Sequence, residues 1–186
     1  GGVSETAATT AETGRGVLGR AVGADVSLAA SDFTEARAEK VVQQVCRDLP
    51  TCWRNGQDLQ AREKWHSASW MAGMGFTNAS LGSTHGLAHA LGGVFRVPHG
   101  RANALLMAQV VAWNADSQGQ CDTEAAPKYA HPARLLRLPA RTARESVPSL
   151  LVAIQALKDE LTLPARLHGL AIRRASRWAR LLITVL

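Results

Sequence analysis

Small and apolar residues recur at spacings of three and four along residues 61–79, and this feature restricts the fold most. At that spacing Trp65, Ala68 and Ala72 lie on one side of a helix. Alanine and glycine are so frequent around them that a neighbouring helix can approach closely. Aromatic residues make up only 5% of the chain, which argues against a β-sandwich or barrel. We therefore predict an all-α fold, a helical bundle.

Helix-capping and helix-breaking residues predict where the other helices begin and end. A helix over residues 31–49 starts at Ser31 or Asp32 and stops before Pro50, since proline lacks the N–H that a helix interior needs. Residues 15–26 contain three glycines, which are poor helix formers, so the sequence alone does not establish a helix there. The remaining assignments are a break or bend at Gly82, a helix at 85–91 ended by Gly92 and Gly93, a helix from Pro98, a loop at 114–132 and a helix at 147–161.

Length and composition indicate one domain. The chain has 186 residues, of which 46% are apolar, enough for a hydrophobic core. No apolar run reaches the ~18 residues that a membrane-spanning helix needs. The three cysteines, Cys46, Cys52 and Cys121, have neither an even count nor metal-type spacing, so we expect a reducing, cytoplasmic location. We predict a loose lead-in at 1–14, a helical domain at 15–164 and a divergent basic tail at 165–186.

The net charge of +6 is concentrated near the C-terminus. Residues 1–132 carry 11 basic and 12 acidic side chains, whereas residues 133–186 carry 10 and 3. A partner attracted by charge would therefore bind the tail. An amphipathic tail helix on an anionic membrane surface is one alternative, but we do not favour it. We expect no nucleic-acid partner, because no recognised binding module accompanies the charge.

Three histidines lie close together in the stretch GSTHGLAHALGGVFRVPHGRAN, at residues 82–103. His85 and His89 are four residues apart and project from one face of a helix. His99 follows a Gly-Gly break beside Pro98, so a chain that turns there returns His99 towards His85. Three imidazoles around one point form the ligand type of a transition-metal site. Spacing alone leaves the alternative that these histidines are satisfied in the core or at the surface.

The same region resembles a known family. The runs AGMGFTNASLG at 72–82, HGLAHALG at 85–92 and PHGRANALL at 98–106, with HSAS from His66, resemble group III, iron-dependent alcohol dehydrogenases. They are most similar to the alcohol-dehydrogenase part of bifunctional aldehyde–alcohol dehydrogenases. Weaker similarity extends from about residue 10 to residue 167. The resemblance implies the metal-binding C-terminal helical domain, without the N-terminal domain that binds NAD(P).

The resemblance also implies a chemistry and site residues. His85 and His99 match metal ligands for iron(II) or zinc, and His89 matches a catalytic histidine beside the metal that places substrate or relays a proton. The implied reaction interconverts a primary alcohol and an aldehyde, with hydride passing to NAD(P). Small alcohols or aldehydes are the implied substrates. No cofactor-binding residue for the nucleotide is assigned, because its domain is not matched.

The family pattern fails on the N-terminal side of this region. The family's other two ligands, an aspartate and a histidine four residues later, align with Gly16 and Arg20. An anionic ligand is thus absent and a neutral ligand has become a cation, so any metal should be held weakly. We expect an impaired part of such an oxidoreductase. The alternative is an inactive remnant or a helical interaction module that forms a homo-oligomer or pairs with another subunit.

Other conspicuous residues have plainer interpretations. We expect Trp65, Trp70 and Trp113 to pack in the core or at an interface, and His66 to have a structural role. Asn78 and Asn103, flanked by alanines, should hydrogen-bond across close helices. A helical domain of this family packs against a partner domain, so the chain should also expose an apolar face.

Overall fold

The computed structural model describes residues 4–79, 82–119 and 122–163, and those residues form helices with no strand. The helices are α1 (Ala7–Asp25), α2 (Asp32–Arg54), α3 (Leu59–Ala79), α4 (Ser83–Phe95), α5 (His99–Asn114), α6 (Ala125–Leu135) and α7 (Ala143–Glu160). The predicted all-α fold is confirmed. In this part of the chain, no helix has the length and apolarity required to cross a membrane.

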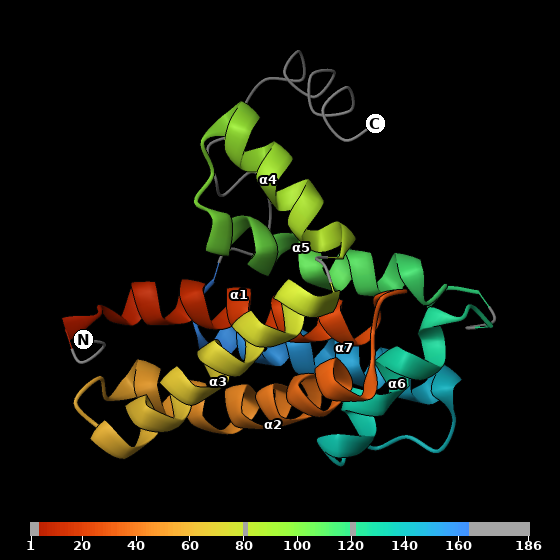
Figure 1. Ribbon diagram of the computed structural model, residues 1–186, viewed down its shortest axis with the longest axis horizontal. Helices are drawn as coiled ribbons and strands as arrows, with labels where there is room; N and C mark the ends of the chain where they lie inside the picture. The colour runs from red at the N-terminus through yellow and green to blue at the C-terminus, as the bar shows by residue number, and fades with distance from the viewer. Residues whose placement is uncertain (1–3, 80–81, 120–121, 164–186) are drawn as a thin grey trace.

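The first helix organises the bundle, because α1 packs on α2, α3, α4 and α5 (Figure 1). The helix begins where the Thr6 side chain accepts a hydrogen bond from the Thr9 amide. The loose lead-in expected at 1–14 is therefore wrong from Ala7 onwards, and α1 also includes residues 15–25, where the sequence alone established no helix. The α1 glycines allow contacts that a side chain would obstruct: a Cβ at Gly14 would lie 2.4 Å from Leu49. Packing thus outweighs glycine's low helix propensity.

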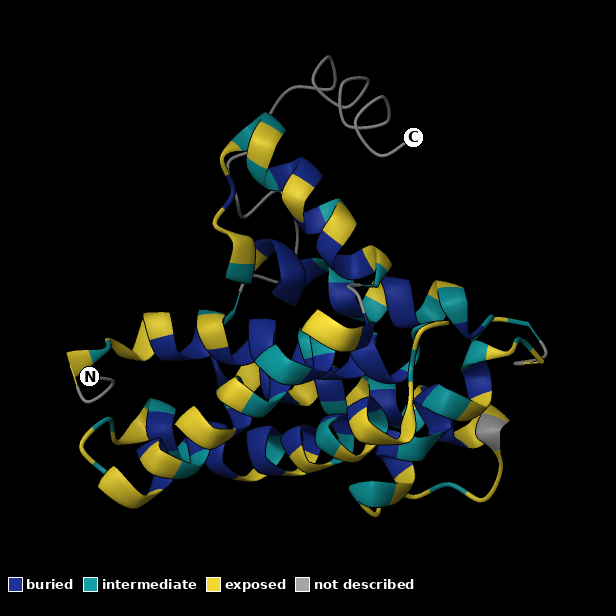
Figure 2. Cartoon of the chain, in the orientation of Figure 1, coloured by how far each residue is buried: buried dark blue, intermediate teal, exposed yellow. Residues whose placement is uncertain are grey.

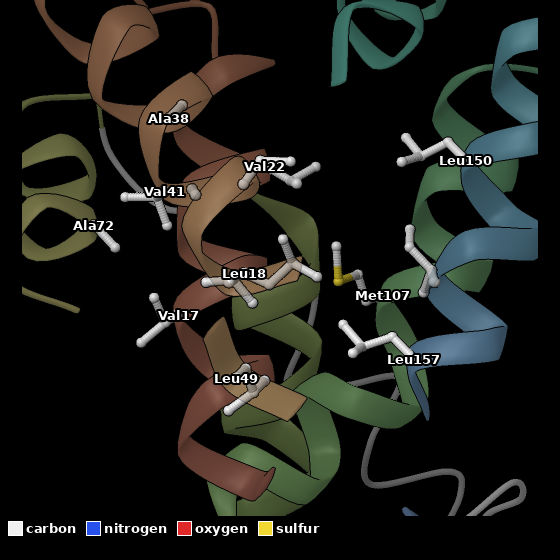
Figure 3. Packing of buried hydrophobic residues seen from close by; sticks show 14 of the residues in the cluster. Val17, Leu18, Val22, Ala38, Val41, Leu49, Ala72, Met107, Leu150 and Leu157 are labelled. Atoms are coloured by element: carbon white, nitrogen blue, oxygen red, sulfur yellow. The ribbon is translucent and has the colours of Figure 1, made fainter. Parts of the chain in front are cut away.

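The main core is formed by residues of α1, α2, α3, α5, α6 and α7. Leu18 and Val22 from α1 point towards Met107 on α5 and Leu150 and Leu157 on α7 (Figure 3). A second, smaller cluster fixes α4 against α5 and consists of Ala88, Leu91, Val97 and Ala102. These two helices rise above α1 in Figure 1, so residues at their inner faces meet the middle of α1.

Two helices continue past the residues where the sequence predicted that they end. Helix α2 continues through Pro50 to Arg54, because Leu49 and Cys52 on its buried face extend the core contact beyond the proline. Helix α4 continues through Gly92 and Gly93 and ends at Arg96, whose left-handed φ of 56° stops it.

The predicted loop at 114–132 is also wrong in part, since α6 occupies Ala125–Leu135. Its buried residues recur at helical spacing and cover the main core: Ala126, Tyr129, Ala130 and Ala133. The helix at 147–161 is confirmed as part of α7.

The tryptophans divide between core and surface. Trp65 is buried, as predicted for core packing, whereas Trp70 and Trp113 are 69% and 86% exposed. Figure 2 shows exposed positions on the outer sides of α3 and α4. The exposed large apolar side chains of the described residues include Trp70 on α3, Trp113 on α5 and Leu28 between α1 and α2, and the expected apolar face stays a prediction.

Candidate functional site

The turn between α4 and α5 brings the three predicted histidines together. Arg96 ends α4, Val97 and Pro98 connect the helices, and α5 starts at His99. The His85 and His99 ring centroids are 5.2 Å apart, and those of His89 and His99 are 4.8 Å apart. The spacing argument therefore identified a real cluster.

Burial differs sharply among the three imidazoles. Only 2% of His85 is exposed, and neither of its ring nitrogens has a hydrogen-bond partner. His89 and His99 are exposed. His85 thus forms the floor of the cluster, while His89 and His99 form a rim that solutes can reach. His66 is exposed on α3 beside Trp70 and does not belong to this cluster.

Helix α1 closes the cluster from below. A Cβ built at Gly19 would lie 3.5 Å from His85 Cε1, an ordinary van der Waals distance, so the imidazole packs close to α1 at this residue. One residue later, the Arg20 guanidinium lies 5.8 Å from the Phe76 ring centroid on α3. Gly16 lies one helical turn before Arg20. A Cβ built at Gly16 would have one neighbouring atom within 4 Å, Arg20 Nη2, at 3.5 Å.

The ionisable groups that affect the pKa values of His85 and His99 are all basic. The pKa of His85 is lowered to about 4, mainly by burial and to a smaller extent by the charges of His99, Arg20 and His89. Burial also lowers the pKa of His99, again with contributions from His89 and Arg20. No carboxylate contributes to either shift. The neutral imidazole is therefore the stable form of His85 at neutral pH.

Asn103 adds a contact that the sequence did not predict. Its side-chain amide donates to the backbone carbonyl of His99 at 2.9 Å and also lies 3.0 Å from His99 Nε2. Because the carbonyl can only accept, the amide nitrogen is correctly oriented, and Nε2 accepts. The expected bond across helices is thus replaced by one within α5. Asn78 likewise donates within its own helix, to the Met74 carbonyl.

Comparison with known proteins identifies the origin of this arrangement. The sequence profile of the Fe-containing alcohol dehydrogenase family, C-terminal, matches residues 10–180. The chain belongs to the Fe-containing alcohol dehydrogenase family. The resemblance seen in the histidine stretch is therefore confirmed.

Relatives in this family are longer than the chain. The chain is 44% identical over 165 residues to the 1-propanol dehydrogenase PduQ of Citrobacter freundii, covering 88% of this chain and 43% of the relative. It is 39% identical over 158 residues to an aldehyde-alcohol dehydrogenase of Streptococcus pneumoniae, covering 81% and 18%. The chain thus spans less than half the length of these relatives.

Solved structures in the family share the fold. A crystal structure of 1,3-propanediol oxidoreductase superposes with a TM-score of 0.90 at 32% identity, covering 99% of this chain and 47% of that one. An alcohol dehydrogenase from Oenococcus oeni superposes with a TM-score of 0.89 at 25% identity, covering 98% and 46%. The seven helices therefore correspond to the helical C-terminal domain of these enzymes.

The family's iron does not fit the residues present here. In the part of the chain described by the structure, no group of three or more His, Cys, Asp or Glu side chains is arranged to hold a metal ion. His99 Nε2 is already engaged by Asn103, and the nearby fixed charge, Arg20, is positive. The unpartnered nitrogens of His85 are available, but one neutral imidazole does not make a stable divalent site.

Proposed function

We propose that this chain is the helical part of an oxidoreductase that interconverts a primary alcohol and an aldehyde with NAD(P), and that its metal site is impaired. The observation that carries the proposal is the convergence of His85, His89 and His99 beside Gly16 and Arg20 on α1. The site keeps the histidine half of a family-type centre, while the other half has lost its carboxylate. Small alcohols or aldehydes are the substrate class, by analogy with the named relatives.

Within this proposal the chain's residues have limited tasks. His89, exposed at the rim, is placed to orient a substrate hydroxyl or relay a proton. His85 and His99 are the residues that would contact iron(II) or zinc, which we propose is weakly held if at all. NAD(P) would be bound by a domain outside these residues, as the share of each relative that is matched suggests. The 186-residue chain alone is then catalytically impaired, in a cytoplasmic setting.

A metal titration tests the proposal. Zinc, or iron(II) under anaerobic conditions, is added to the full chain, to the His85→Ala and His99→Ala variants, and to a double variant Gly16→Asp, Arg20→His. We expect weak binding by the unmodified chain and at least ~100-fold tighter binding by the double variant, which regains an anionic and a neutral ligand. Tight stoichiometric binding by the unmodified chain, lost in both alanine variants, would contradict the impaired site.

A second candidate function is that of a helical interaction module. An open groove of about 720 Å³ between α4 and α5 is lined by Leu87, Leu106, Val110 and the exposed Trp113. Such an apolar surface suits a homo-oligomer or a partner subunit. Sedimentation of the full chain and of Trp113→Ser discriminates the two functions: an oligomer dispersed by the substitution supports the module, and a monomer opposes it.

A further inference from the structure

Arg20 is an unpaired cation at the histidine cluster. In the described part of the chain its guanidinium makes no hydrogen bond or ion pair, and it lies over the Phe76 ring. Burial lowers the pKa of Arg20, which remains charged at neutral pH. A half-buried guanidinium normally has an anionic partner, because desolvation without one is costly.

The floor of the cluster also lacks hydrogen-bond partners. Both ring nitrogens of His85 are buried and unpaired although only 2% of the residue is exposed. A neutral imidazole carries one N–H donor, and leaving that donor buried without an acceptor is unfavourable. His99 has a donor as well: since Nε2 accepts from Asn103, the ring proton of neutral His99 is on Nδ1.

Space for an acceptor exists next to these donors. Apart from Arg20 Nη2, no atom outside its own helix backbone lies within 4 Å of a Cβ placed at Gly16. The exposed rim of His89 and His99 leaves the cluster open to solvent. Arg20 Nη2 therefore borders a space at Gly16 that no other side chain enters within 4 Å of that point.

We propose that the cluster of Arg20, His85, His89 and His99 binds a small monocarboxylate. The guanidinium supplies a planar pair of donors that matches a carboxylate, and the neutral imidazoles add N–H donors. Since the cluster has a single fixed positive charge, it balances a monoanion better than dianionic phosphate. This inference rests on the proposed function in one respect, namely that no tightly held metal occupies the histidines.

Nearby acidic side chains do not fill this role. Glu12, whose backbone carbonyl lies against Gly100 at the start of α5, is paired with Arg101 at 2.6 Å. Asp25 lies near Lys128, Glu35, Glu39 and His131, away from the cluster. Neither Glu12 nor Asp25, among the described residues, is therefore the anionic partner of Arg20.

Acetate is the probe for this proposal. The full chain, kept in EDTA to remove metal, is titrated with sodium acetate at constant ionic strength set by chloride, and ¹H–¹⁵N spectra of the histidine rings and of the α1 amides are recorded. We expect saturable shifts at His85, His99 and the amides around Arg20. Shifts that grow linearly, or that chloride alone reproduces, would overturn the proposal, as would tighter binding of inorganic phosphate.

Two variants locate the binding site. Arg20→Gln should weaken acetate binding by about tenfold or more, whereas Arg134→Gln, a matched change at an exposed arginine on α6, should not alter it. Gly16→Asp should also abolish binding, because its own carboxylate reaches Arg20 while every proposed donor is retained. Unchanged acetate affinity in either Arg20→Gln or Gly16→Asp would overturn the assignment.

The metal titration and the acetate titration fail independently. Tight zinc binding by the unmodified chain would refute the impaired metal site, whereas acetate is measured in EDTA and reports on Arg20 and the imidazoles alone. Weak zinc binding together with absent acetate binding would refute only the carboxylate site.

Discussion

Arg20 Nη2 lies 3.5 Å from the point where a Cβ at Gly16 would stand, so the guanidinium borders the space that the glycine leaves. The two residues are one helical turn apart on α1, facing the histidines of α4 and α5. A cation therefore occupies the side of the cluster on which an anionic metal ligand would be needed. This relationship determines what the cluster can hold.

Removing metal should leave the stability of the unmodified chain unchanged. If His85 and His99 hold no metal tightly, EDTA has no bound species to extract, and the melting temperature measured by circular dichroism should not move. The Gly16→Asp, Arg20→His variant should respond, because metal at a hundred times its dissociation constant adds about 2.7 kcal/mol to the free energy of unfolding. A melting temperature of the unmodified chain that falls on chelation would contradict the prediction.

Replacing Arg15 with methionine should stabilise the fold. Arg15 is fully buried in α1, donates to the carbonyls of Ile154 and Ala104 at 3.3 and 3.1 Å, and leaves Nε without a partner. Burial lowers its pKa to about 10, the sign of an unfavourably placed charge. Because methionine fills similar volume without that charge, we expect the free energy of unfolding to rise by about 1–3 kcal/mol in urea titrations.

The control for Arg15 is Arg47→Met, at an exposed arginine whose ion pair with the adjacent Asp48 should contribute little. A loss of stability in Arg15→Met, with Arg47→Met near zero, would mean that the two bonds to helix carbonyls outweigh the desolvation of the guanidinium.

Asp25 should make the protein less stable as the pH rises from about 4 to 6. Burial raises the pKa of this carboxyl from 3.8 to about 6, with the charges of His131, Glu35, Lys128 and Glu39 contributing less. Between these values the folded state holds a proton that the unfolded state has released, so stability is complete below the lower pKa and is lost through the higher one. Asp25→Asn should remove this dependence.

For Asp25→Asn we expect a gain of about 1–3 kcal/mol in the free energy of unfolding at pH 7 and little change at pH 3.5, from the shift in pKa. Denaturant titrations across this range measure both quantities. A variant that differs equally from the parent at both pH values would show that packing, and not ionisation, is responsible.

Sequence reasoning succeeded where local chemistry and packing agree. The four-residue spacing of His85 and His89, with a turn before His99, predicted the cluster now measured by ring distances near 5 Å. It failed for α1, because glycine's cost is visible in the sequence while the contacts of Gly14 with Leu49 and of Gly19 with His85 are not. Those contacts join residues far apart in the chain.

Two side-chain orientations in the site were also not predicted from the sequence. The orientation of Asn103 towards His99 follows from α5 geometry, and an Asn four residues after a helix-starting His was the available signal. The position of the Arg20 guanidinium beside Gly16 could not be inferred, because an arginine on α1 has many rotamers and Phe76 on α3 helps to select one. Family resemblance identified both positions, but not what their side chains do.

Adding a methyl group at Gly100 should disturb the cluster, whereas the same change at Gly86 should not. A Cβ at Gly100 would lie 2.6 Å from the Glu12 carbonyl oxygen, so the start of α5 must move away from α1. Because His99 is the preceding residue, its ring should move as well. We expect Gly100→Ala to lose about 1–3 kcal/mol in the free energy of unfolding and to weaken acetate binding.

A Cβ at Gly86 meets nothing within 4 Å, so Gly86→Ala should gain about 0.5–1 kcal/mol from helix propensity. Equal effects of the two changes in urea titrations would mean that α5 is not held against α1 at this point.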